Sequence, residues 1–175
     1  RTGGSSILPV FWSLSKNPPG TYGRVEVRYA VSGSPPDVTA AWYYYDGSSH
    51  GAQAYRYVTL GNAEWHHIVV VMTSSQIQVY VDGAAGTAGT GSSGLPPLTN
   101  FYFGSDWGGS PVWYGAFAES GLWNTALSAG DIASLAAGLK PNIVATASLV
   151  AYWPFTNNTS PSPDDKNDYD LTLSG

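Results

Sequence analysis

Short apolar runs rich in Val, Ile, Tyr and Trp alternate with clusters of Gly, Pro, Ser and Asn along most of the chain. This pattern is typical of many antiparallel strands joined by turns. We expect strands near residues 7–14, 24–31, 38–45, 54–60, 65–73, 76–82, 100–104, 112–123 and 149–154. The segments between them have turn composition, such as "KNPPG" at 16–20 and "DGAAGTAGTGSSG" at 82–94. The pattern therefore predicts an all-β protein.

One segment, residues 126–141, has helical rather than strand periodicity. Its apolar positions at helical spacing are Leu127, Ile132, Leu135 and Leu139. Ser128 is the expected N-cap, with Asp131 three residues later at the positive end of the helix dipole. Gly and Pro follow at 138 and 141, where a helix would end. We expect one short helix near residues 128–138.

The stretch "GNAEWHHIVVVMTSSQIQVYVDG" at 61–83 places two histidines beside a glutamate and upstream of Asp82, which raises the question of a metal or catalytic site. Two serines separate its apolar runs, so we expect a hairpin. Period-two alternation sends His66 and His67 to opposite faces of the strand, and they cannot share a metal ion. We interpret His67 as a packed or hydrogen-bonded histidine, His66 likewise, and Asp82 as a turn residue that caps its own backbone.

Length and composition fit one domain with a substantial core, since the chain has 175 residues of which 43% are hydrophobic. Only 11% of residues are charged, against roughly a quarter in an average soluble protein. Seven basic residues without a cluster, and a net charge of −5, argue against a nucleic-acid partner. The longest apolar run, residues 68–72, is too short to insert in a membrane. Without cysteine there is no disulfide framework.

Three segments in order resemble a known family. They are "EWHHIVVVMTSSQIQVYVDG" at 64–83, "FYFGSD" at 101–106 and "GAFAESGLWNTALSAGDIASL" at 115–135. Together they resemble the laminin G-like, pentraxin-like domains of the concanavalin A-like lectin and glucanase group. The resemblance implies a two-sheet antiparallel jelly-roll sandwich, with ligand sites at the loop rim or on the concave face.

The resemblance also implies a domain organisation. Members of this family usually open with a pair of strands before the region that begins here at "SSILPVFWSLSK", residues 5–16, so the front strands are expected to be missing from a jelly roll spanning 1–148. The C-terminal segment, residues 149–175, resembles the stretch that often begins such a unit. It either closes this sandwich with an edge strand, which we favour, or begins another unit or pairs with a neighbouring subunit.

An enzymatic function is not expected. Retaining glucanases of this fold need a nucleophile and an acid about 5 Å apart, on alternate positions of one strand. The three glutamates, Glu26, Glu64 and Glu119, are scattered instead. Signatures of other hydrolases and of nucleotide binding are absent from the sequence.

Two kinds of binding site have candidate residues. For Ca²⁺, the hard oxygen ligands would be Asp46 in "YYYDGSS" and Asp106 in "FGSDWGGS". For carbohydrate, aromatic rings that stack on sugar faces would be Tyr43, Tyr45, Trp107, Trp113 and Tyr114. Tyr43 and Tyr45 face opposite to Trp42 and Tyr44 in a strand, so one pair is core and the other is exposed. The acidic run at 164–170 is interpreted as a solvated turn.

The sequence thus predicts a non-catalytic module for glycan recognition or adhesion, located outside the cell, on the cell surface or on a virion surface. Its partner would be a glycan or other cell-surface ligand. The alternative is a purely structural decoration, fibre or surface-layer protein that contacts other subunits and binds no small ligand.

Overall fold

The computed structural model describes residues 10–16, 22–30, 35–45, 47–61, 63–91, 99–105, 113–156, 163–166 and 169–171. They belong to two compact units, residues 1–115 and residues 116–175. The predicted boundary after residue 148 is not tested by this division and stays a prediction.

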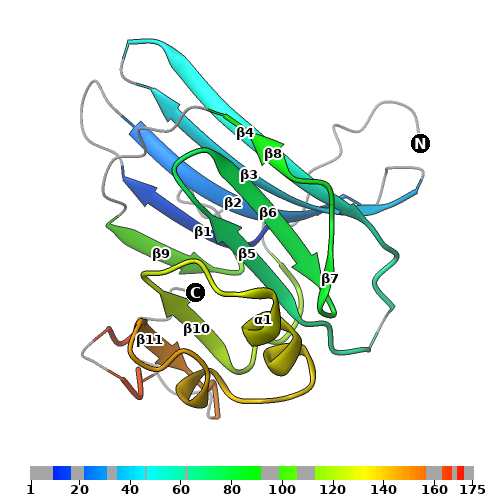
Figure 1. Ribbon diagram of the computed structural model, residues 1–175, viewed down its shortest axis with the longest axis vertical. Coiled ribbons are helices and arrows are strands. Elements are labelled where there is room, and N and C mark those ends of the chain that lie inside the picture. The colour runs from blue at the N-terminus through cyan, green and yellow to red at the C-terminus, as the bar shows by residue number, and fades with distance from the viewer. Residues whose placement is uncertain are drawn as a thin grey trace. The chain divides into compact units, whose positions relative to one another are not determined.

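The first unit contains a five-stranded antiparallel sheet. Its strands are β1 (Val10–Lys16), β2 (Tyr22–Ala30), β3 (Asp37–Tyr45), β4 (Ser49–Tyr57) and β9 (Asn100–Phe103). They lie in the order β4-β3-β2-β1-β9 (Figure 1). Neighbouring strands in this order are joined by hairpins except for β9, which returns from far along the chain to pair with β1.

A smaller antiparallel sheet forms the second layer of this unit. Its strands are β5 (Ile68–Met72), β6 (Gln76–Val81), β7 (Ala84–Ala85) and β8 (Gly89–Thr90). The predicted hairpin is present, with Met72 opposite Ile77 across the turn at Ser74 and Ser75. Strand β6 packs on β3 and β4, so the two sheets lie face to face (Figure 1). The predicted two-sheet antiparallel sandwich is confirmed.

Alternation fills the space between the sheets. The buried inner positions of the five-stranded sheet and of β6 are Val25, Val27, Val38, Ala40, Trp42, Ala54, Ile77, Val79 and Val81. Burying each Val, Ile or larger side chain in such a core contributes about 1.5–3 kcal/mol relative to exposure. The need to bury these side chains fixes the register of strand pairing, because a shift by one residue would turn every side chain of a strand to the other face.

The sequence pattern missed parts of the strands. Strand β4 begins at Ser49, five residues before the predicted start, because "SHGAQ" carries no apolar alternation and is ordered by pairing with β3. The segment predicted as one long turn at 82–94 contains β7 and β8, which pair with β6. Of the described residues 113–123 in the predicted strand 112–123, only Ser120–Trp123 form a strand, and Glu119 before it has a positive φ of 51°.

The second unit combines a two-stranded sheet with the predicted helix. Strand β10 (Ser120–Trp123) pairs antiparallel with β11 (Leu149–Trp153), and α1 (Ala129–Ala136) is followed by a short 3-10 helix at Pro141–Ile143. Ser128 is the N-cap and forms a capping box with Asp131, as the sequence predicted. Ile132 and Leu135 are the buried residues of the helix. The described helices include none long and apolar enough to span a bilayer.

Candidate functional site

The five-stranded sheet has an outer face, turned away from β6, that is polar and aromatic. Its side chains come from the positions that alternate with the core residues. On β2 they are Arg24, Glu26 and Arg28; on β3 Asp37, Thr39, Ala41, Tyr43 and Tyr45; on β4 Gln53, Tyr55 and Tyr57. Direct pairing places Glu26 opposite Ala41 and Thr39 opposite Tyr55. Three neighbouring strands therefore contribute one continuous surface.

A buried carboxylate lies at the centre of the β2 part of this outer face. The side chain of Glu26 is 2% exposed and lies between two arginines whose side chains are about one third exposed. Arg28 donates a hydrogen bond from Nη2 to Oε2 of Glu26, while Nη1 of Arg24 lies 3.4 Å from Oε1. Because both arginines reach solvent and the glutamate does not, this row presents guanidinium groups at the surface of the sheet.

Tyrosines flank the arginine row. The guanidinium of Arg24 lies over the ring of Tyr43 at 4.8 Å from its centre, so one face of that ring is occupied. The rings of Tyr55 and Tyr57 lie 5.0 Å apart in a tilted arrangement, and Tyr57 is 57% exposed. The Tyr55 and Tyr57 rings, which we call the tyrosine pair, form a second aromatic surface on the outer face.

The loop that carries two predicted site residues, Asp106 and Trp107, follows β9, and its described ends contact β1. Gly104 donates its N–H to the carbonyl of Phe11, and Trp113 donates its N–H to the carbonyl of Gly104 at 2.7 Å. The hydroxyl of Ser13 donates to the carbonyl of Ser105 at 3.1 Å. The bases of this loop are therefore fixed to β1 of the five-stranded sheet.

The predicted site residues have different outcomes. Asp46, Asp106 and Trp107 lie outside the described residues. Tyr43 and Tyr45 are 39% and 36% exposed on the outer face while Trp42 is 1% exposed, as expected. Tyr44, which was expected in the core with Trp42, is only partly buried.

Two further aromatics of the predicted site differ in surroundings. Trp113 packs against Phe11, with ring centres 4.6 Å apart, and is only partly exposed. Tyr114 is 94% exposed. Their roles in sugar binding stay predictions.

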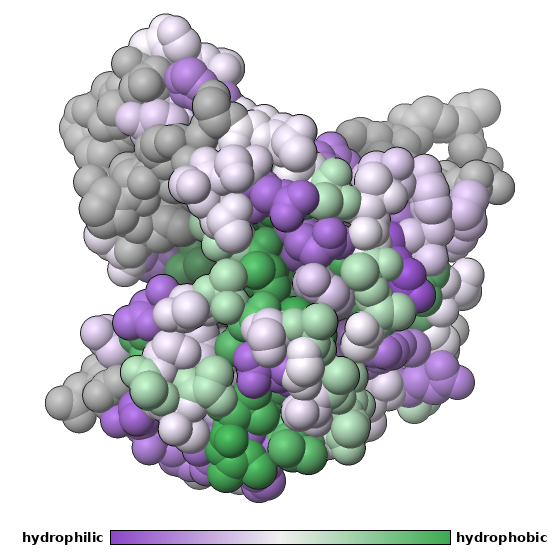
Figure 2. Space-filling model, in the orientation of Figure 1, coloured by the Kyte–Doolittle hydropathy of each residue, from purple (hydrophilic) through white to green (hydrophobic). Residues whose placement is uncertain are grey.

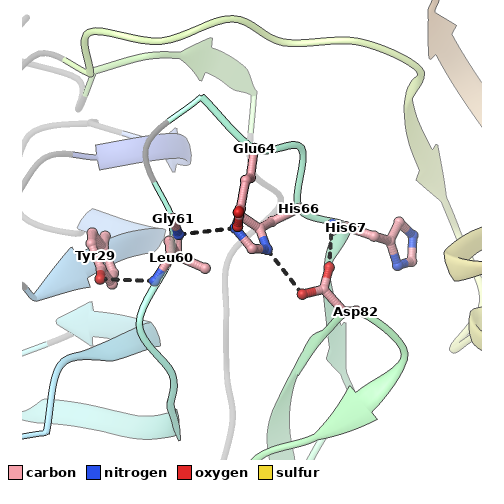
Figure 3. A network of polar contacts seen from close by, with 7 residues as sticks. All are labelled: Tyr29, Leu60, Gly61, Glu64, His66, His67 and Asp82. Carbon is pink, nitrogen blue, oxygen red and sulfur yellow. Dashed lines mark hydrogen bonds and ion pairs between the residues drawn. The ribbon is translucent and has the colours of Figure 1, made fainter.

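The histidine cluster at the start of β5 is a structural network (Figure 3). Nδ1 of His66 lies 2.9 Å from Oδ2 of Asp82, and Nε2 accepts a hydrogen bond from the N–H of Gly61 at 3.3 Å. This pattern places the proton of a neutral His66 on Nδ1. The His67 ring points away from the His66 ring, as alternation predicted (Figure 3). Within the described part of the chain, no group of three His, Asp or Glu side chains could hold a metal ion.

Asp82 does not cap its own backbone, which corrects the sequence interpretation. Its Oδ1 accepts the N–H of His67 at 2.9 Å across the hairpin. The reason is the turn itself: Asp82 and Gly83 both have positive φ, as in a two-residue type I′ hairpin, which directs the carboxylate back toward β5. Burial opposes ionisation of Asp82, but hydrogen bonds from His66 and His67 hold its pKa below the ordinary value.

We expect acid to destabilise the fold in two stages. Burial lowers the pKa of His67 below its ordinary value of 6.5, despite the opposing charge of Asp82. Below that pH the unfolded state takes up a proton before the folded state does, so the free energy of unfolding decreases as pH falls. The lowered pKa of Asp82 adds a second loss at more acidic pH.

Urea titrations at a series of pH values measure this dependence. In the H67Q variant, the decrease in the free energy of unfolding that begins near pH 6.5 should disappear, while the decrease at more acidic pH should remain. An unchanged profile in H67Q would contradict the assignment to His67.

Sequence reasoning missed the arginine row and the tyrosine pair. A signal for the row was present: in "RVEVR" at 24–28, charged residues alternate with valines, which places all three charges on one face. The pattern did not show which strands are neighbours in the sheet. Only the strand order brings Tyr43 beside Arg24 and places the tyrosine pair on the same face.

The acidic run of the second unit is partly structural rather than solvated. Asp164 is 9% exposed, and its Oδ1 accepts the N–H groups of Tyr152 and Lys166 at 2.7 and 2.9 Å. The N–H of Asp164 in turn donates to Asp170. These carboxylates anchor the C-terminal segment to β11.

Comparison with known protein families gives a match. A laminin G-type family model, described as the concanavalin A-like lectin/glucanases superfamily, matches residues 10–133, which is more than half of the 175-residue chain. Neither the curated proteins nor the solved structures contain a significant match. The matched range runs from the first described strand to α1.

Proposed function

Since the chain belongs to the concanavalin A-like lectin/glucanases superfamily, we propose that it is a non-catalytic module that binds carbohydrate through the outer face of its five-stranded sheet. The observation that carries this proposal is the combination on one face of the exposed Tyr57 and half-buried Tyr55 with partly exposed arginines, Gln53 and Thr39. Aromatic rings contact the apolar faces of sugars, and polar side chains bind their hydroxyls.

The arrangement of carboxylates supports a binding role over glucanase chemistry. Glycosidases hold two carboxyl groups about 5–10 Å apart. On the described outer face, the two are Glu26 and Asp37, and Glu26 pairs opposite Ala41, four residues from Asp37. Four residues of a strand span about 13 Å. Glu26 is also buried between arginines, which leaves it poorly placed to donate or accept a proton at a sugar.

Tyr57 provides a direct test of this surface. We expect Y57A to weaken glycan binding about five- to tenfold, because stacking on an aromatic ring contributes about 1 kcal/mol. Loss of this exposed ring should change stability by less than about 0.5 kcal/mol. A glycan array identifies the ligand, and isothermal titration calorimetry then compares the variants.

Y169A is the matched control, because Tyr169 is 56% exposed against 57% for Tyr57 but belongs to the second unit. It should bind like the wild type. If the wild-type protein binds no glycan on the array, the carbohydrate proposal is contradicted.

A location outside the cell, on a cell surface or on a virion surface is part of the same proposal, since glycans are displayed there. Calcium at Asp46 and Asp106 also remains a proposal. The described residues offer no other metal site.

A structural role in a virion, fibre or surface layer is the second candidate. It is supported by the side of the smaller sheet turned away from the five-stranded sheet, where Val69 and Val71 of β5 lie beside Tyr80 of β6 and are only half-buried. Figure 2 shows apolar residues gathered in the centre of the view, where Figure 1 has β5 and β6. Apolar surface of this kind suits a subunit contact. Analytical ultracentrifugation distinguishes the structural role from carbohydrate binding. Self-assembly of a protein that binds no glycan would favour the structural role.

A further inference from the structure

We propose that the outer face selects a negatively charged sugar, one carrying a carboxylate or a sulfate group, and that Arg24 is the residue that binds the anion. This inference rests on the proposed carbohydrate function and specifies its ligand class. It starts from a difference among the arginines of the five-stranded sheet.

Arg24 is the arginine of this sheet whose terminal Nη groups make no hydrogen bond with another described residue. Arg28 donates to Glu26, and Arg56 donates from Nη1 to the carbonyl of Ala85 at 3.0 Å. Arg24 has an ion pair with Glu26 at 3.4 Å, but it forms no hydrogen bond with another described residue. Its Nε is buried without a partner, as are the Nε atoms of Arg28 and Arg56. A guanidinium has five N–H donors in a planar fork that matches carboxylate and sulfate oxygens. Since Nε is buried, the Nη groups are the donors that Arg24 offers to a ligand.

The Arg24 guanidinium is also held in place before a ligand arrives. It stacks on Tyr43 at 4.8 Å, while 32% of its side chain stays exposed. Stacking fixes the plane of the guanidinium while the side chain stays partly exposed, so that little side-chain entropy is lost when an anion binds the Nη groups.

The charges on the outer face leave positive potential at the Arg24 end. The single buried carboxylate of Glu26 is shared by two arginines and makes its hydrogen bond with Arg28. Asp37, the other carboxylate of the described outer face, lies toward Arg28, since it pairs opposite Ala30. The positions paired with Arg24 are the uncharged Ser15 and Tyr43. An anion at Arg24 therefore meets a local positive charge on a chain of net charge −5.

The test compares matched ligands on the intact chain by isothermal titration calorimetry. A galacturonate oligosaccharide is titrated beside its fully methyl-esterified form, which has the same shape without the charge, and beside a sulfated galactan oligosaccharide. We expect at least one anionic ligand to bind tenfold or more tightly than a neutral ligand of the same length, with a preference that declines as salt increases. The carboxylate and sulfate arms then identify the anion.

Three variants assign the preference. R24Q should abolish it, R24K should keep only part because the charge remains without the fork, and R56Q, which removes the same charge elsewhere in the sheet, should keep it in full. R24Q retains the bond between Arg28 and Glu26, and melting curves verify that each variant is folded.

The outcomes distinguish this inference from the function on which it rests. Equal binding of the charged and esterified ligands, or an R24Q variant that keeps the preference, would overturn the assignment to Arg24. Binding of neutral glycans alone would overturn it and leave the carbohydrate function standing. If no glycan binds, both proposals fail.

Discussion

Replacing both arginines of the outer face, in R24M/R28M, should lower the free energy of unfolding by about 3–5 kcal/mol, because it leaves a buried carboxylate without a counter-charge. The side chain of Glu26 is 2% exposed, so solvent cannot replace the two guanidinium groups without opening the sheet. Methionine keeps the aliphatic bulk that covers Glu26, which confines the change mainly to charge and hydrogen bonding. Urea unfolding followed by tryptophan fluorescence measures the loss.

A triple variant distinguishes charge from packing. Adding E26L to R24M/R28M removes the unpaired carboxylate, and we expect it to restore more than half of the lost stability, since apolar replacement of a whole buried ionic group is often neutral or stabilising. If the triple variant is as unstable as the double, the loss arises from packing and the electrostatic explanation is wrong. E26L alone should cost less than R24M/R28M, because the two arginines can reach solvent.

The second large effect is expected at Gly89. A Cβ atom at this position would lie 2.3 Å from the backbone oxygen of Gln53, and one at Gly86 would lie equally close to that of Tyr55. Thr87 between them exchanges backbone hydrogen bonds with Tyr55, so residues 86–89 run directly against β4. Since a backbone atom cannot move aside as a side chain can, we expect G89A to cost about 3 kcal/mol, the upper part of the range for overpacking.

The matched control is G130A in α1. A Cβ there would meet only the Oγ of Ser128 at 3.7 Å, and the change from glycine to alanine should stabilise the helix by up to about 1 kcal/mol. Thermal and urea unfolding should show a lower free energy of unfolding for G89A and a higher one for G130A. A G89A variant as stable as the wild type would show that residues 86–89 do not need close contact with β4.

These glycines also explain why the sequence pattern was misread at 82–94. The segment "DGAAGTAGTGSSG" has the composition of a loop, and by local preference it is one. Its strands exist because β6 offers backbone partners, and because Gly86 and Gly89 can approach the backbone of β4 more closely than a residue with a Cβ atom. Such long-range pairing has no signature in a local window.

Local physics determined much of this protein from its sequence alone. Period-two alternation identified which side chains share a face, including the separation of His66 from His67 and of Trp42 from Tyr43. Short-range hydrogen bonding determined the Ser128 capping box and the turn between β5 and β6. These features depend on neighbours within a few residues, so the order of residues contains the necessary information.

Only the tertiary structure decided which face is covered and which strands are neighbours. Alternation placed three charges together at 24–28, but the strand order buried Glu26, set Arg24 beside Tyr43 and added the tyrosine pair from β4. Many strand orders are compatible with the same alternation. Hydrogen-bond pairing and the hydrophobic effect select one of them, because both act between segments that are distant in the chain. The candidate carbohydrate surface is therefore a property of the assembled sheet, while its separate residues can be read from the sequence.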